Sequence, residues 1–242
     1  MLVTGHTVLI TGGSRGIGFA MAKALTGLGN KVVITGKNED NLHKAKQLLP
    51  KVDTLVCDLS SPLAIIELVA RVRIEYPELN MLINNAGVQY NYSFKENESF
   101  TERVDKEIQV NLNAPVQLCA RLLPLISRNS SASVVNISSG LGLVPKASAP
   151  VYCATKAGIH IFTKALRYQM TDVKVFEVIP PLVATDMTTG RGKDKMSPDR
   201  LAEQFIQGLR KDQYEMNIGK TKLLRLIQRI SPRIADSILK NG

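Results

Sequence analysis

The sequence predicts an α/β fold, a doubly wound parallel sheet of about seven strands with helices on both faces. Short β-branched and apolar runs alternate with longer segments whose apolar residues recur every three or four positions. The short runs are apolar at nearly every position, which is typical of strands covered on both faces. A glycine-rich segment directly after the first run is a third observation in favour of this fold class.

Seven strand candidates follow one another along the 242 residues. They cover 8–10, 31–35, 54–57, 81–84, 133–137, 174–179 and, as the weakest pattern, 214–218. The intervening segments carry helical stripes, for example Phe19, Ala22, Leu25 and Leu28. Because neither repeats nor a linker break this order, we expect a single domain over 1–242. Its cofactor half covers about 1–140, and its catalytic and substrate half about 105–219.

Composition describes an ordered globular protein, with 44% hydrophobic and 21% charged residues. No run approaches the roughly 20 apolar residues that cross a bilayer. The N-terminus lacks the basic start and apolar core of a signal peptide. We therefore expect a cytoplasmic location.

The reactive and metal-binding residue types are few. Cys57, Cys119 and Cys153 form no Cys-x-x-Cys pair, and the chain has three histidines, His6, His43 and His160. A disulfide framework and a metal site are therefore not expected. Cys153 and His160 are interpreted as structural residues of the core.

The net charge of +10 could attract nucleic acid, an anionic membrane or a phosphorylated ligand. Aromatic residues make up only 5% of the chain, and no nucleic-acid recognition motif occurs. A nucleic-acid partner is therefore not expected.

A glycine-rich loop, Thr-Gly-Gly-Ser-Arg-Gly-Ile-Gly at 11–18, directly follows the first strand. Its glycines permit a tight turn, close approach of a pyrophosphate and close packing of helix on strand. The helix that starts here offers free N–H groups and a favourable dipole to phosphate. A merely tight turn is the alternative, but the strand–loop–helix setting favours a dinucleotide site. The expected cofactor contacts are Gly12, Ser14, Arg15, Gly16, Ile17 and Gly18.

The end of the second strand indicates which dinucleotide is preferred. An acidic side chain there would bind the adenosine ribose and favour NAD. The chain instead has Thr-Gly-Lys37, and Lys37 with Arg15 could clamp the 2′-phosphate of NADP. Glu39 and Asp40 follow closely and leave a ribose contact open. The pattern favours NADP(H) over NAD(H).

Tyr152 and Lys156 lie four residues apart in a predicted helix and so share one face. A free tyrosine has a pKa of about 10, and a neighbouring ammonium lowers it, so that Tyr152 could donate and accept protons. Such pairs are common on solvated helix faces. Ser139, at the end of the fifth strand, places a hydroxyl where the nicotinamide would lie, which favours the catalytic interpretation.

Together these residues resemble the short-chain dehydrogenase/reductase family. The resemblance extends to about residue 187 and rests on several motifs in the family's order. They are Thr-Gly-x-x-x-Gly-Ile-Gly at 11–18, Asp58-Leu59, Asn84-Asn-Ala-Gly87, Asn111, Ser139 and Tyr152-x-x-x-Lys156.

The resemblance implies an oxidoreductase that moves hydride between a nicotinamide cofactor and a carbonyl or secondary alcohol. Asn111, Ser139, Tyr152 and Lys156 would form its catalytic tetrad. Tyr152 would be the acid/base, and Ser139 would hold and polarise the substrate oxygen. Lys156 would depress the pKa of Tyr152 and bind the nicotinamide ribose. Asn111 would support a water-linked proton relay.

The resemblance also implies cofactor contacts beyond the glycine-rich loop. Asp58 and Leu59 would contact adenine, and Thr185, close to Val183, would hold the carboxamide. The adenosine side would be lined by Asn85, Ala86 and Gly87. One departure is Pro180-Pro181, where the family usually has Pro-Gly; the second proline removes a backbone N–H.

The resemblance implies a homodimer or homotetramer, paired through helices of the fourth and fifth crossovers. Residues 109–125 and 154–170 would supply those faces. Within the family the chain resembles a bacterial subgroup named DltE, after an operon for D-alanylation of teichoic acid. That association predicts no substrate.

The segment 219–242 carries six basic residues and one acidic residue, half of the chain's net charge. Its apolar residues recur at helical spacing and are interrupted by Pro232. Such a helix could lie on an anionic membrane surface. Packing against the domain or a second subunit, with the charges in water, is the favoured alternative.

The loop 190–198 is glycine-bearing and charged. Late loops of this fold overhang the strand ends where ligands bind, so it could act as a substrate lid. An ordinary surface loop is an equal alternative.

Two other functions are weighed. A regulator that binds a dinucleotide without chemistry would have little reason to keep the serine, tyrosine and lysine together. An epimerase or dehydratase with the same cofactor generally carries an added substrate domain, for which 242 residues leave no room. The small-molecule oxidoreductase is therefore the preferred interpretation.

Overall fold

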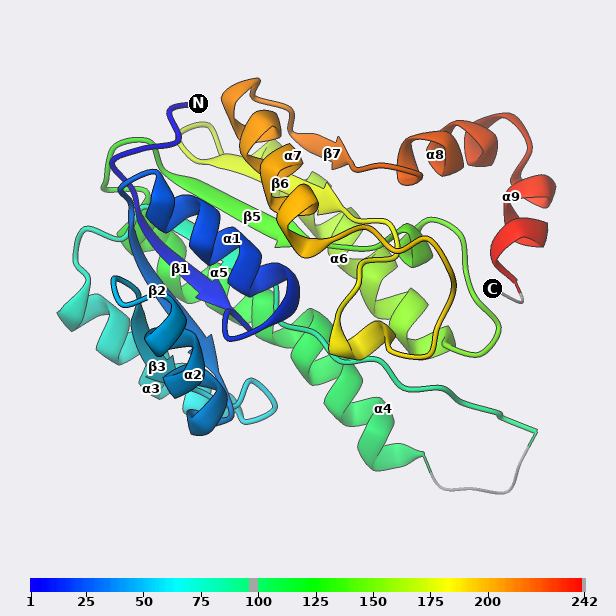
Figure 1. Ribbon diagram of the computed structural model, residues 1–242, viewed down its shortest axis with the longest axis horizontal. Helices are drawn as coiled ribbons and strands as arrows, with labels where there is room; N and C mark the ends of the chain where they lie inside the picture. Colours follow the sequence, from blue (N-terminus) through cyan, green and yellow to red (C-terminus); the bar gives the residue numbers. More distant parts are fainter. Residues whose placement is uncertain (96–99, 241–242) are drawn as a thin grey trace.

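The computed structural model describes residues 1–95 and 100–240 and has a seven-stranded parallel sheet at its centre (Figure 1). The strand order is β3–β2–β1–β4–β5–β6–β7, so the predicted doubly wound fold is confirmed. The strands are β1 Thr7–Thr11, β2 Lys31–Gly36, β3 Asp53–Val56, β4 Met81–Asn84, β5 Ser133–Ile137, β6 Lys174–Ile179 and β7 Glu215–Asn217.

Strand bounds differ from the sequence predictions by one residue at one or both ends of β1, β2, β3 and β7. The third strand ends at Val56, one residue earlier than predicted, which leaves Cys57 at the sheet edge. The last strand is shorter at both ends than the predicted 214–218 because its pairing with β6 involves only Glu215, Met216 and Asn217.

Helices connect the strands and cover both faces of the sheet (Figure 1). The longer ones are α1 Gly16–Gly27, α2 Glu39–Leu48, α3 Pro62–Glu75, α4 Thr101–Ile108, α5 Ala114–Ile126, α6 Pro150–Gln169, α7 Pro198–Arg210, α8 Thr221–Ile230 and α9 Pro232–Leu239. A π-helical turn, Gln109–Asn113, links α4 to α5, and short 3₁₀ turns cover Gly140–Gly142 and Asp186–Thr188.

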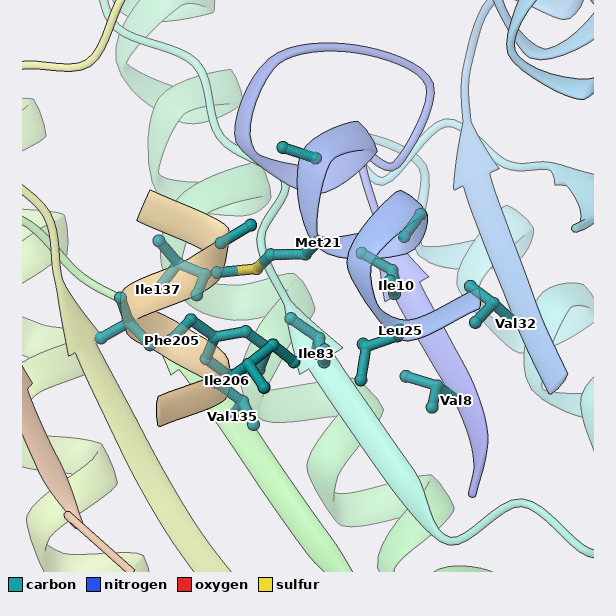
Figure 2. Close-up of a cluster of buried hydrophobic side chains, with 14 of the residues drawn as sticks. Val8, Ile10, Met21, Leu25, Val32, Ile83, Val135, Ile137, Phe205 and Ile206 are labelled. Carbon is teal, nitrogen blue, oxygen red and sulfur yellow. The ribbon is translucent and has the colours of Figure 1, made fainter. Parts of the chain in front are cut away.

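Alternate residues of each central strand enter two separate cores. Val8 and Ile10 pack under α1, α2 and α7, whereas Leu9 faces the helices of the opposite side. Figure 2 shows the first core, where Met21 of α1 and Phe205 of α7 meet the sheet. Burial on both faces explains why the strands are apolar at nearly every position.

The start of α1 lacks the side-chain cap that several other helices have. Asn38 and Ser61 cap α2 and α3 by accepting hydrogen bonds from backbone N–H groups, and Ser197 caps α7 in the same way. By contrast, the residue before α1 is Arg15, which makes no such side-chain cap. The first N–H groups of α1 therefore remain available to a ligand.

Polar side chains inside the sheet bind one another. Asn84 Nδ2 donates to Asn136 Oδ1 at 2.8 Å, and Asn136 Nδ2 donates to Thr163 Oγ1 of α6 at 2.9 Å. The Asn84–Asn136 bond joins the neighbouring strands β4 and β5. These bonds fix α6, which carries Tyr152 and Lys156, against β5.

Candidate active site

A cleft of about 490 Å³ lies at the carboxyl ends of the central strands. This is the position where parallel sheets with a reversal of strand order bind ligands, here between β1 and β4. Most of the predicted site residues line it, namely Gly12, Ser14, Arg15, Gly16, Ile17, Lys37, Asp58, Leu59, Asn85, Ala86, Gly87, Tyr152, Lys156 and Thr185. Gly18, Asn111, Ser139 and Val183 lie outside this lining.

The glycine-rich loop is shaped by close backbone contacts. Gly12 has φ +63°, and a Cβ there would lie 2.9 Å from Ala86 Cα. Gly16 also has a positive φ, +57°. A Cβ at Gly18 would collide with the carbonyl of Gly12, so this glycine packs α1 onto the loop instead of facing the cleft. The loop, the uncapped helix and the cleft size fit a dinucleotide.

Asp58, Lys37 and Lys106 all line the cleft. Partial burial would raise the pKa of Asp58, but hydrogen bonds from Ser60 and the charges of Lys37 and Lys106 hold it below its usual value. Ser60 contributes its N–H at 2.9 Å and its hydroxyl at 2.7 Å. An ionised Asp58 can accept hydrogen bonds from an adenosine.

Arg15 and Lys37 both line the cleft. Arg15 Nη1 donates to Asp186 Oδ2 at 2.8 Å, and both side chains are mostly exposed. Glu39 and Asp40, the alternative ribose partners, form the first turn of α2 and are absent from the cleft lining.

Tyr152 and Lys156 project from one face of α6 and are both buried. Lys156 Nζ donates to the carbonyl oxygen of Ile137 at 2.8 Å and lies 5.7 Å from the centre of the Tyr152 ring. The predicted juxtaposition of the two side chains is present. The carboxyl end of β5 holds the ammonium in place.

Burial dominates the titration of this pair. It raises the pKa of Tyr152 to about 12, and hydrogen bonding with Ser139 opposes the shift. It lowers the pKa of Lys156 to about 8, against the opposing charge of Glu177. The predicted lowering of the pKa of Tyr152 is therefore not found in this structure, because desolvation dominates and the Lys156 ammonium is bonded to Ile137.

The two serines after β5 have different surroundings. Ser139 caps the 3₁₀ turn, where its Oγ accepts from Leu141 N at 3.1 Å. Ser138 is buried, lines the cleft and donates to the carboxylate of Glu177. Sequence reasoning missed Glu177, which lies in the middle of an otherwise apolar strand.

Glu177 belongs to a buried polar group beneath these serines. It is 1% exposed, and its carboxylate lies 2.9 Å from His160 Nδ1. The structural interpretation of His160 is confirmed by this bond. Glu215 joins His160 and Glu177 within 4.8 Å, but its carboxylate pairs with Arg225 at 3.3 Å. The group is thus internally paired by a histidine, a serine and an arginine.

Asn111 holds the loop after β4. Its Oδ1 accepts from Val88 N at 2.8 Å, and its Nδ2 donates to Val88 O at 2.8 Å. A weaker bond reaches Thr155 Oγ1 of α6 at 3.3 Å. Asn111 therefore connects the cleft wall to the helix of Tyr152.

The segment after β6 forms a further part of the cleft wall. Pro180 and Thr185 line the cleft, and Thr185 begins the 3₁₀ turn Asp186–Thr188. Val183 is buried and forms an isolated bridge with Met196. This bridge anchors the far end of the charged loop considered above as a lid.

The sequence analysis did not predict several cleft residues, because they lie near the other site residues in space but not along the chain. Lys106 and Tyr90 reach the cleft from segments around the loop after β4. Glu107, next to Lys106, is fully buried and accepts from Tyr92 Oη at 2.8 Å. Cys57 could have been inferred, since it directly precedes Asp58 at the end of β3.

A family model for short chain dehydrogenases matches residues 6–196. This chain belongs to that family, and it is accordingly a nicotinamide-dinucleotide-dependent oxidoreductase in class. It is 39% identical over 234 residues to the "Uncharacterized oxidoreductase DltE" of Bacillus subtilis, covering 93% of this chain and 92% of that protein. It is 32% identical to a 3-oxoacyl-[acyl-carrier-protein] reductase FabG of Rickettsia felis, covering 88% and 85%.

Solved structures share the fold at low identity. A short chain dehydrogenase from Burkholderia cenocepacia in complex with NADP has TM-score 0.87 and 21% identity, with 100% of both chains covered. A short-chain dehydrogenase from Sphingobium yanoikuyae in complex with NADPH has TM-score 0.81 and 24% identity, with 96% of both chains covered. A relative from Burkholderia phymatum in complex with NAD has TM-score 0.83 and 19% identity, covering 95% and 96%.

Among the described residues, no helix combines the length and hydrophobicity needed to cross a bilayer.

Proposed function

We propose that the chain, acting as a single domain, is an NADP(H)-dependent oxidoreductase that interconverts a carbonyl compound and a secondary alcohol. One observation carries the proposal. The glycine-rich loop, Tyr152 and Lys156 line the same cleft, at the point where the strand order reverses. A dinucleotide bound by the loop would extend towards the tyrosine.

The protein's residues supply the proton chemistry. A bound nicotinamide supplies or accepts hydride at the substrate carbon. In reduction, Tyr152 donates its phenol proton to the substrate oxygen, and in oxidation the phenolate takes that proton back. Ser139 holds and polarises the same oxygen, and its hydrogen bonding to Tyr152 opposes the rise in the pKa of the phenol that burial causes.

Lys156 and Asn111 act beside the tyrosine in this proposal. The Lys156 ammonium favours the phenolate of Tyr152 and binds the nicotinamide ribose. Asn111 holds the loop at Val88 and supports a water-linked proton relay. Both side chains are buried, so their electrostatic effects are weakly screened.

Cofactor preference rests on Arg15 and Lys37, two cationic side chains of the cleft lining that suit a 2′-phosphate. The remaining proposed contacts follow the cleft. Asp58 and Leu59 contact adenine, and Thr185, anchored beside Val183, holds the carboxamide. The adenosine side is formed by Asn85, Ala86 and Gly87.

We also propose a cytoplasmic homodimer or homotetramer. The three cysteines are free and buried, as suits a reducing compartment. The faces proposed to pair lie along 109–125 and 154–170. On the second of these, Ile161 and Tyr168 are 62% and 75% exposed, and a partner subunit would cover them.

A screen of ketones and aldehydes with NADPH or NADH tests the function. The proposal predicts carbonyl-dependent loss of NADPH absorbance. Binding of NADPH without turnover of any carbonyl or alcohol would favour the rival function, a regulator that binds the dinucleotide. Failure to bind either cofactor would contradict the cofactor assignment itself.

A further inference from the structure

The C-terminal helices α8 and α9 expose a row of large aliphatic side chains. Leu223, Leu226 and Ile230 of α8 are 60%, 53% and 75% exposed. Ile234 and Ile238 of α9 are 55% and 49% exposed. Of the two packing arrangements expected from the sequence, packing of these residues against their own domain is not found, because α8 and α9 turn them outward. Packing against a second subunit stays a prediction.

The helices themselves are firmly attached, so this exposure does not come from a loose terminus. Thr221 is buried at the start of α8, and its hydroxyl donates to Ile179 O at 3.0 Å. Ala235 is fully buried in α9. Lys240 O accepts a hydrogen bond from Ala147 N at 3.0 Å. The two helices that carry the aliphatic row lie at one end of the molecule (Figure 1), and these contacts hold them there.

Basic side chains flank the row on the same two helices. Lys222 and Arg229 lie seven residues apart on α8 and share one flank of it, and Arg233 and Lys240 repeat this spacing around α9. All four residues are exposed. These four basic residues and the aliphatic row are together called the basic face. The row consists of Leu223, Leu226, Ile230, Ile234 and Ile238.

A second copy of the chain or a lipid surface could cover the basic face, and its charge distinguishes between the two. A symmetric contact between two copies would bring the same basic residues of each together. Asp236 is the one acidic residue in 219–242, so such a contact would leave most of these charges unmatched. An anionic lipid surface instead neutralises them while its acyl boundary accepts the aliphatic side chains.

We infer that the basic face is a peripheral binding site for an anionic membrane surface. The two helices lie in the plane of the lipid headgroups, with the aliphatic row directed into the bilayer and the four basic residues at the phosphates. The site is separate from the cofactor cleft, none of whose lining residues belong to the basic face.

Co-sedimentation of the full-length protein with lipid vesicles tests the inference. We expect binding to vesicles of phosphatidylcholine with phosphatidylglycerol, and at least about tenfold weaker binding to phosphatidylcholine alone. Added salt should weaken the binding. Lys222→Gln/Arg229→Gln and Leu226→Glu/Ile230→Glu should each lower the affinity for anionic vesicles at least about tenfold.

The matched control is Leu63→Glu/Ile74→Glu, which replaces two aliphatic residues of α3 that are 71% and 80% exposed. It should bind vesicles as the wild type does. Circular dichroism and NADPH binding monitor the fold of every variant. Equal binding to both vesicle types, or none to either, would overturn the inference. So would an oligomer that Leu226→Glu/Ile230→Glu dissociates while vesicles do not bind, since a second copy would then cover the face.

Discussion

Lys156 Nζ donates a hydrogen bond to the carbonyl oxygen of Ile137, 2.8 Å away, inside the candidate active site. The bond joins the helix that carries Tyr152 to the end of β5, which Ser138 and Ser139 directly follow. An ammonium group in this buried position is costly, and burial lowers the pKa of Lys156 to about 8. This unfavourable free energy of burying the ammonium should make the stability of the protein depend on pH.

Replacing Lys156 by Met should remove one pH-dependent part of the free energy of unfolding. Below pH 8 the folded and unfolded chains both hold this proton. As the pH rises from about 8 towards 10.5, the folded chain releases it and the unfolded chain keeps it. The contribution of Lys156 to stability therefore rises with pH, by up to about 3 kcal/mol.

Urea unfolding of the wild type and of Lys156→Met over this pH range measures the difference. Lys164→Met is the matched control, because Lys164 is exposed on the same helix. A difference between wild type and Lys156→Met that stays constant with pH would contradict the prediction.

Glu177→Gln should change the pH dependence of catalysis. The charge of Glu177 raises the pKa of Lys156 against burial, so its loss lowers that pKa further. Lys156 then loses its proton at lower pH, and the alkaline limb of the rate profile should move down by roughly 0.5–1 pH unit. Glu215→Gln, which removes a carboxylate paired with Arg225 nearer the surface, should leave the limb in place. An unchanged limb in Glu177→Gln would refute the electrostatic coupling.

Asn111→Ala should destabilise the protein by about 1–3 kcal/mol, since it leaves both backbone groups of Val88 without their side-chain partner. Asn113→Ala removes only an exposed bond to Gln109 and should have a much smaller effect. Denaturant unfolding of the two variants measures this contrast. Equal losses would show that the Asn111 amide does not hold the loop.

The double variant Arg15→Ala/Lys37→Ala should bind NADPH at least about tenfold more weakly, with little change for NADH. Asp186→Asn is the informative control. The ion pair between Asp186 and Arg15 is exposed and contributes at most about 1 kcal/mol to stability. Its loss leaves Arg15 in place, so NADPH binding should persist or tighten. Nicotinamide fluorescence titrations of the wild type and of both variants measure the affinities for NADPH and NADH. NADH binding as tight as NADPH binding in the wild type would refute the preference and redirect attention to Glu39 and Asp40.

The fold and most of the cleft could be predicted because their signals are local. A glycine-rich loop between a strand and a helix has few other uses, and Tyr152 and Lys156 share a helix face by spacing alone. The buried group of Ser138, His160 and Glu177 could not be predicted, because three separate segments bring it together. The raised pKa of Tyr152 depends on its burial, which the spacing of Tyr152 and Lys156 in the sequence does not indicate.

The C-terminal segment shows a different limit. Its helical spacing and charge were evident in the sequence, but amphipathicity does not say which way the apolar stripe faces. The attachments of Thr221 and Ala235 decide that, and they turn Leu226 and Ile230 outward.

The central claim is proton transfer by Tyr152 coupled to hydride transfer from NADPH. The most direct measurement uses NADPH deuterated at the transferring position with a carbonyl compound identified by the screen. Mass spectrometry then follows deuterium into the alcohol. We predict one deuterium on the carbinol carbon for the wild type. Tyr152→Phe should bind NADPH normally and form product about 10²–10⁴-fold more slowly. Undiminished deuterium transfer by Tyr152→Phe would contradict the account.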